Sequence, residues 1–305
     1  MQPSLNEDQI QILEFLDSLS KPYATAPLHD TSFALHSDEL DRELAEGGFL
    51  DVMAMPELGA ATAALVAERL ARLPFAVEAA VSALVRPLIN PELPRPICLV
   101  EEGQLRKPVR FLKPGATVVV IGAETVRTFI ASADLVRSAG DEVLFAYPMA
   151  YLQGVPADAR HHDVSADEVR RAWRVALAAE TAGLLAAALQ NVSTYVSERK
   201  QFGRALATFQ AVRHRLAEAQ VATNGVYWLA IRAAATADAG DAALAALHAQ
   251  ETAQKVCYDY HQFLGAMGMT LEHPLHLWTY RLKALTADLG GRGEQALAAA
   301  EAIWG

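Results

Sequence analysis

The chain has 305 residues, 52% hydrophobic and 20% charged, which predicts a folded protein with a substantial core and excludes wholesale disorder. Its 26 Lys and Arg against 36 Asp and Glu give a net charge of −10, which argues against a nucleic-acid-binding protein because phosphate contacts need a basic field. The two cysteines lie far apart and indicate neither a disulfide framework nor a zinc site.

The N-terminal zone, residues 1–90, is predicted to be helical. Ser4-x-x-Glu7 has the pattern of a capping box ahead of an apolar stripe with helical spacing. Ser37 is a candidate N-cap for a second helix, which the pair Gly47-Gly48 would end, and Pro87 would end the last helix of the zone. After the first, the predicted helices cover residues 38–46, 60–73 and 75–86.

The middle zone, residues 91–163, changes character where prolines interrupt the helical pattern. Short runs rich in β-branched and aromatic residues predict a small antiparallel sheet. These runs cover residues 97–100, 109–112, 117–121, 126–130 and 142–147.

The C-terminal zone, residues 164–305, is predicted to be a four-helix-like bundle. Ser165-x-x-Glu168 is a second capping box, and glycines at 203, 240 and 265 would end successive alanine-rich helices. The predicted helices cover residues 165–199, 209–237, 242–264 and 275–289, with a short one from about 294. The fold class is therefore α+β and mostly α. With no signal peptide pattern and no apolar run near the ~20 residues of a membrane span, we expect a cytoplasmic protein.

Two segments stand out from generic helix. Residues 195–204, with Phe209-Gln210 after them, gather cations and a glutamine at a helix end, where the planar arginine fork suits a diphosphate. Residues 261–274 form a glycine-rich break where backbone can approach a ligand closely. The plainer interpretation is a solvated helix end and a C-cap.

These two segments resemble the C-terminal signatures of the acyl-CoA dehydrogenase family. The stretch Glu198-Arg-Lys-Gln-Phe-Gly-Arg204 and the stretch Gln262-Phe-Leu-Gly-Ala-Met-Gly-Met-Thr270 carry the resemblance, and Met55-Pro-Glu-x-Gly59 extends it upstream. The family's order of helices, sheet and helices also matches. The resemblance implies FAD, an acyl-CoA substrate, α,β-dehydrogenation and an electron-transfer protein as acceptor.

The resemblance also implies which residues contact FAD across a subunit interface. Arg199 is expected to contact the FAD diphosphate, and six other residues are expected to contact the same cofactor. The cofactor-binding residues so expected are Arg199, Phe202, Gln210, Gln262, Gly265, Ala266 and Glu294.

The chain departs from the family at the catalytic base, which must be a positioned carboxylate. The two family positions are Gly290 and Trp173, and neither is an acid. The carboxylates nearest in sequence to these positions are Asp288 and Glu180, which are therefore weak candidates for the catalytic base. Each can also be interpreted as an ordinary helix residue. The family's flavin-side loop is also shortened, to Val100-Glu-Glu-Gly103.

These departures favour a partner role. The chain would donate FAD contacts to a catalytic sister subunit in a heteromer, expected as α2β2, acting on a steroid side-chain type of thioester. The rival interpretations are a self-sufficient homo-oligomer with a relocated base and a flavin-free structural or binding homologue. The histidines at 161, 162, 273 and 276 place no complete metal ligand set, so no metal site is expected.

Overall fold

A computed structural model describes residues 5–27 and 32–305. The N-terminal helices are α1 (Glu7–Ser20), α2 (Asp38–Glu46), α3 (Gly59–Ala71), α4 (Ala80–Leu84) and α5 (Arg86–Ile89). The strands that follow are β1 (Ile97–Glu101), β2 (Pro108–Arg110), β3 (Thr117–Ile121), β4 (Val126–Ile130), β5 (Val136–Ser138), β6 (Met149–Leu152) and β7 (Arg160–His162). The C-terminal elements are α6 (Ala166–Glu198), β8 (Lys200–Gln201), β9 (Arg204–Ala205), α7 (Gln210–Thr236), α8 (Ala239–Leu264), α9 (His276–Leu285) and α10 (Arg292–Trp304). The mostly helical α+β class is as predicted.

The N-terminal helices confirm one predicted cap and correct another. Ser37 caps α2 by accepting a hydrogen bond from the Leu40 amide. The Ser4 of the expected capping box lies outside the described residues, and α1 is instead capped by Asn6, which forms a capping box with Gln9. The helix predicted over 75–86 is wrong in extent, because α4 is short and Pro87 lies in the first turn of α5, where proline is tolerated.

The strands form two small sheets rather than one. The first has the order β1-β3-β4-β7 and the second the order β2-β6-β5. Pairing is antiparallel as predicted except between β1 and β3, which run parallel. The strand predicted over 142–147 is wrong, since the chain there is irregular and β2 pairs with β6 instead.

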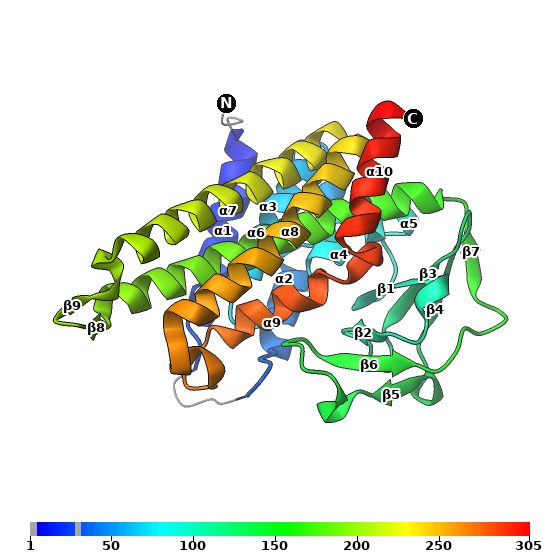
Figure 1. Cartoon of the computed structure of the whole chain (residues 1–305). Coiled ribbons are helices and arrows are strands. Elements are labelled where there is room, and N and C mark those ends of the chain that lie inside the picture. The colour runs from blue at the N-terminus through cyan, green and yellow to red at the C-terminus, as the bar shows by residue number, and fades with distance from the viewer. Residues whose placement is uncertain (1–4, 28–31) are drawn as a thin grey trace.

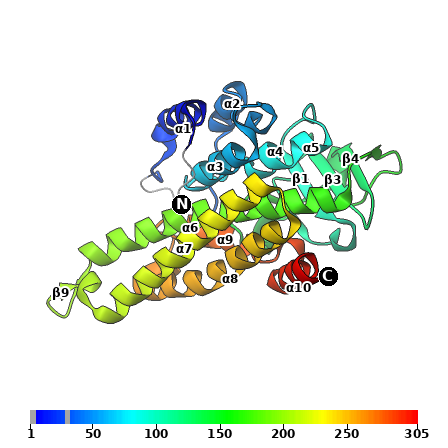
Figure 2. The same cartoon turned by 90° about the horizontal axis from the view of Figure 1, so that it is seen from above.

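The bundle is built on α6, α7 and α8, which lie side by side in two views, with α9 and α10 against α8 (Figure 1, Figure 2). Gly240 does not end a helix: Ala237, in the left-handed region, ends α7, and Asp238 caps α8 so that Gly240 lies in its first turn. By length and composition α6 could cross a membrane, but 83% of its most apolar window is buried inside the protein. That burial is the property of a core helix, and one such helix is weak evidence for a span.

The N-terminal helices dock on the bundle through α3 and α6. Gly183 of α6 lies so close to α3 that a Cβ at this position would be 2.0 Å from the carbonyl oxygen of Glu68. Small residues permit such an approach, and alanines at 178, 179 and 182 of the same helix are fully buried. One hydrophobic core joins the helices, and a second fills the strand region.

Candidate functional site

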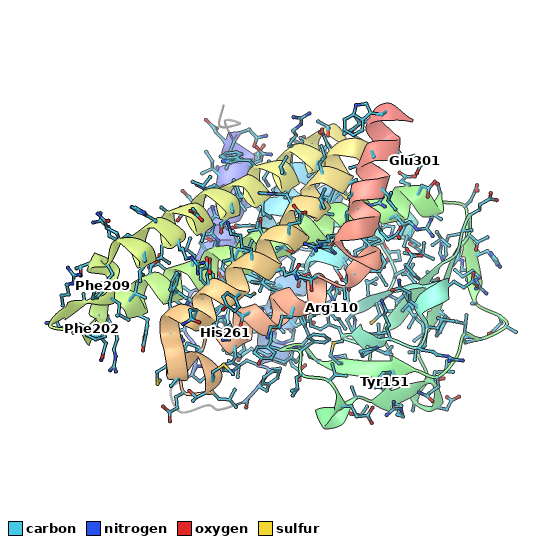
Figure 3. The ribbon with its side chains drawn as sticks, viewed as in Figure 1. Arg110, Tyr151, Phe202, Phe209, His261 and Glu301 are labelled. Atoms are coloured by element: carbon cyan, nitrogen blue, oxygen red, sulfur yellow. The ribbon has the colours of Figure 1, made fainter. Side chains whose placement is uncertain are left out.

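The two candidate carboxylates meet on one arginine. Arg110, at the end of β2, donates through Nη1 to Glu180 Oε2 at 3.1 Å and through Nη2 to Asp288 Oδ2 at 2.8 Å. Tyr147 donates its hydroxyl to the other oxygen of Glu180 at 2.6 Å. Strand β2, helix α6 and the segment after α9 therefore converge on one cluster, of which Figure 3 labels Arg110.

Burial controls the charges of this cluster. It raises the pKa of the Asp288 carboxyl, and the Arg110 charge opposes that rise. It also raises the pKa of Tyr147 well above its usual value, so the phenol stays protonated and donates.

The adjoining cavity has a volume of about 130 Å³ and is lined by Arg110, Glu180, Asp288 and Trp173. Ligand pockets typically measure ~300–1,000 Å³, so this cavity is small for a drug-sized ligand.

Neither expected base position can present a carboxylate here. Gly290 has a φ of +79°, and a Cβ there would lie 2.3 Å from Cγ of Glu294, whose side chain fills the space. Trp173 is buried, and its indole nitrogen has no hydrogen-bond partner in the described part of the chain.

A second candidate region lies at the end of the bundle, where β8 and β9 form a hairpin (Figure 1, Figure 3). The hairpin turns at Phe202 and Gly203, both with positive φ, and Phe202 is 90% exposed. Arg204 lies over the ring of Phe209 at 4.1 Å. The exposed Arg199 side chain has no ion pair or hydrogen bond among residues 5–27 and 32–305, so it is free to bind an anion.

A larger pocket, of about 870 Å³, opens between α8, α9 and the start of α10. Its wall contains three glutamines, two cations and the glycine-rich run before α10. The glutamines and cations are Gln250, Gln254, Gln262, Lys283 and Arg292. The residue Gly265, which also lines the pocket, has φ +57° and open space where a Cβ would lie.

His261 fixes the turn that borders this pocket. Burial lowers its pKa, so the ring is neutral, and Nδ1 must donate to the Gly268 carbonyl at 2.6 Å because a carbonyl only accepts. Nε2 lies 2.9 Å from the Thr279 hydroxyl, whose one hydrogen is shared between this nitrogen and the Leu275 carbonyl 3.1 Å away. The end of α8 is also tied to α6, since the Tyr195 hydroxyl donates to the Leu264 carbonyl at 3.5 Å. The two regions carrying the cation-rich and glycine-rich segments thus lie at the same end of α6 and α8.

Comparisons with known proteins show what the chain is similar to in sequence and in fold. Residues 171–303 match the family model of the acyl-CoA dehydrogenase C-terminal domain. The chain is 37% identical over 141 residues to the acyl-CoA dehydrogenase FadE28 of Mycobacterium tuberculosis, covering 42% of this chain and 40% of that protein. It is 36% identical over 107 residues to the short-chain specific acyl-CoA dehydrogenase of Clostridium acetobutylicum, covering 33% of this chain and 28% of that protein. Residues 171–303 are therefore similar to acyl-CoA dehydrogenase C-terminal domains.

The similarity of fold extends over the whole chain. A solved structure named the Tcur3481-Tcur3483 steroid ACAD G363A variant has a TM-score of 0.78 at 22% identity and covers 98% of both chains. The ChsE4-ChsE5 complex from Mycobacterium tuberculosis has a TM-score of 0.74 at 18% identity and covers 97% of both. In sequence, the chain spans less than half the length of the curated acyl-CoA dehydrogenases it matches.

The acyl-CoA dehydrogenase resemblance singles out seven residues, and the structure places all of them on exposed backbone or with exposed side chains. Gln262 and Gly265 line the large pocket and Ala266 follows them in the same turn, whereas Arg199, Phe202 and Gln210 lie around the hairpin. Glu294 lies beside Gly290 in the first turn of α10. Within the described residues, no group of three or more His, Cys, Asp and Glu is placed to hold a metal ion.

Sequence reasoning missed Arg110, Tyr147, His261 and Lys283. Arg110 and Tyr147 lie in the strand region, outside the family signatures, and their partners are 178 and 33 residues away in the chain. His261 opens the glycine-rich segment and Lys283 lies on the following helix, and no sequence motif marked either as a functional residue.

Proposed function

We propose that this chain is a subunit of an FAD-dependent acyl-CoA dehydrogenase and helps to bind FAD at the interface with a catalytic sister subunit. The observation that carries the proposal is that none of the candidate positions offers an available carboxylate to act as the catalytic base. Asp288 and Glu180, the candidate carboxylates, are both engaged by Arg110, while the family positions Gly290 and Trp173 offer no acid.

A self-sufficient dehydrogenase is the less favoured alternative. The base must accept a proton from the substrate α-carbon, which needs a carboxylate within hydrogen-bond reach of that carbon. The oxygens of Glu180 accept from Tyr147 and Arg110, and one oxygen of Asp288 accepts from Arg110. Freeing either carboxylate would break one of the two ion pairs that Arg110 makes in a buried site, which is unfavourable.

The two halves of FAD fit this chain differently. Acyl-CoA dehydrogenases are FAD-dependent, and the flavin accepts the hydride in their reaction. The cavity at Arg110 does not fit a flavin ring, since its ~130 Å³ are bordered by a salt-bridged cluster and by Trp173. The unpaired Arg199 and the open backbone at Gly265 do fit the diphosphate and adenosine half, by charge and by close approach.

The proposed partners follow from this division. The sister subunit would supply the base, the ring site and most of the acyl-CoA pocket, in an α2β2 assembly that passes electrons to an electron-transfer protein in the cytoplasm. Both similar structures reported above carry the names of two proteins, and one is named a steroid ACAD. These names support a heteromer and a bulky steroid-type thioester as substrate.

Flavin retention by the assembled enzyme tests the proposal. The chain is co-expressed with the products of neighbouring genes, and FAD is measured by absorbance after dialysis for the wild type, for Arg199→Ala and for the control Arg213→Ala. Loss of a charge-assisted hydrogen bond of ~1.5–3 kcal/mol weakens FAD binding about 10- to 100-fold in Arg199→Ala, with no change in the control. Unchanged flavin content in Arg199→Ala contradicts the proposal.

Colour and size separate the rival functions. We expect the chain purified alone to be colourless and to associate, and the co-expressed complex to be yellow. A yellow, active single chain would indicate self-sufficiency. A colourless monomer that gains no flavin from any co-expressed neighbour would indicate a flavin-free homologue.

A further inference from the structure

We propose that the pocket between α3, α6 and α7 binds an uncharged aromatic compound whose N–H or O–H group donates a hydrogen bond to Glu68. This pocket shares no lining residue with the cavity at Arg110 or with the pocket between α8, α9 and α10. It also contains no residue of the two segments that resemble the acyl-CoA dehydrogenase signatures. The inference therefore concerns a separate site and does not rest on the proposed function.

Four helices supply the walls of this pocket. Helix α3 lies beside both α6 and α7 (Figure 2), and its end is tied to α9 because the Trp278 indole donates to the Arg72 carbonyl at 3.0 Å. The α6 wall includes alanines 182, 186 and 187, whose small side chains leave room for a volume of about 660 Å³. That volume lies within the ~300–1,000 Å³ range of ligand pockets.

Glu68 is a buried carboxylate in this pocket with one oxygen left without a donor. Its side chain is 3% exposed, and Oε1 takes both contacts from Arg72, at 2.8 Å from Nε and 2.6 Å from Nη2. Among residues 5–27 and 32–305, none donates a hydrogen bond to Oε2. Buried polar atoms are nearly always hydrogen-bonded, so the second oxygen of Glu68 indicates a ligand that donates.

The charges around Glu68 favour a ligand without a charge. Arg72 compensates the carboxylate, so a cation at Oε2 would be repelled by the guanidinium and an anion by Glu68. The Glu68 charge still acts across the pocket, since after burial it is the next cause that raises the pKa of Tyr227 on α7. A neutral donor gains a hydrogen bond to a charged acceptor and adds no further charge to a buried site.

The α7 wall of the pocket is aromatic. The rings of Tyr227 and Trp228 lie 4.8 Å apart at an angle of 82°, so together they present a ring face and a ring edge. Trp228 is exposed in spite of its size, and Trp278 adds a third aromatic ring to the lining. Aromatic rings pack on one another face to edge or offset, so these walls favour a planar aromatic ligand.

Thr223 provides an independent indication of a ligand. It lines the pocket and is 3% exposed, and its Oγ1 is buried without a hydrogen-bond partner in the described part of the chain. The Tyr260 hydroxyl lies nearby, but it too lacks a partner at hydrogen-bond distance. A second polar group on the ligand would complete the hydrogen bonding of Thr223.

Ligand-observed NMR titration of the purified full chain with indole tests the inference. The wild type should bind indole about tenfold more tightly than 1-methylindole, which has the same rings but no donor, because a hydrogen bond to a charged acceptor is lost. Glu68→Gln should remove most of this preference. Glu218→Gln is the matched control, since Glu218 pairs with Lys255 outside the pocket, and it should keep the preference.

A second variant tests the position of the site with Glu68 intact, so the test does not depend on the folding of Glu68→Gln. Ala186→Leu fills the pocket from α6 at little cost in helix propensity and should abolish binding of both compounds. Ala217→Leu, on α7 outside the pocket, should change nothing.

The contrary outcomes are equally specific. The inference is overturned if the wild type does not bind indole, if it binds 1-methylindole equally well, or if binding survives Ala186→Leu. Tighter binding of tryptamine or indole-3-propionate, which carry a charge on the same rings, would overturn the uncharged class of ligand. Each of these results leaves the proposed function standing if Arg199→Ala still lowers the FAD content of the complex, so the two failures are distinguishable.

Discussion

Arg110 Nη2 lies 2.8 Å from Oδ2 of Asp288, a residue 178 positions later in the chain. Through this contact and the one to Glu180, a strand-region cation holds the long helix α6 and the segment before α10 together. The exposed fractions of the three side chains are 14% for Arg110, 9% for Glu180 and 21% for Asp288, so solvent screens their interaction weakly.

Arg110→Met should therefore destabilise the fold strongly. The substitution leaves two carboxylates without their cation in a buried site, and breaking a buried ion pair from one side costs about 3–5 kcal/mol. Urea unfolding measures the loss. The triple variant Arg110→Met, Glu180→Gln, Asp288→Asn should recover part of it, because no unpaired charge remains. A single variant as stable as the wild type would show that the cluster contributes nothing to docking.

The sequence predicted what depends on local pattern and missed what depends on contacts between distant segments. The strands at 117–121 and 126–130 follow from their apolar, β-branched composition and were predicted with their observed bounds. Asp288 and Glu180 were each identified as carboxylates near a family position, but no periodicity relates either to Arg110. The region around Tyr147 is predicted as a strand because residues 143–147 are a continuous run of apolar and aromatic residues. In the structure β2 pairs with Met149–Tyr151 instead, and the Tyr147 hydroxyl donates to buried Glu180.

Gly183→Ala should separate α3 from α6. The added Cβ would meet a backbone carbonyl at 2.0 Å, which no side-chain rotation relieves, and overpacking of this kind costs ~1–3 kcal/mol. The control is Gly293→Ala in α10, where nothing lies within 4 Å of the added Cβ and φ is not positive. That control should raise stability slightly, by ~0.4–1 kcal/mol, through the unfolded state. Equal melting temperatures for Gly183→Ala and the wild type would contradict the close approach.

Acidification should weaken the fold through His261. Burial lowers its pKa below the ordinary 6.5, so the unfolded chain binds the proton first as the pH falls. The stability that neutral His261 contributes is therefore complete above about pH 6.5 and is lost as the pH falls through the folded-state value.

The test compares urea unfolding of the wild type and His261→Gln between about pH 7.5 and pH 5. The variant should be less stable at the higher pH, by ~1–3 kcal/mol for the lost buried hydrogen bonds, but should lose less on acidification. His162 and His273, whose pKa values are also lowered by burial, remain in both proteins and cancel in the comparison. Parallel pH profiles for the two proteins would exclude His261 as the source.

Asp288→Asn should leave turnover by the co-expressed complex nearly unchanged. A general base contributes typically 10²- to 10⁴-fold to a rate, so a catalytic Asp288 would lose about that much on becoming an amide. Here the carboxylate is held by Arg110, and the raised pKa of Asp288 reflects burial rather than a vacant acceptor facing substrate. Flavin absorbance and acyl-CoA-dependent reduction of a dye acceptor give FAD content and turnover on the same sample. Glu180→Gln, measured in parallel, tests the other carboxylate of the cluster. Loss of turnover in Asp288→Asn with FAD still bound would make this chain catalytic in its own right and refute its proposed role as a supporting subunit.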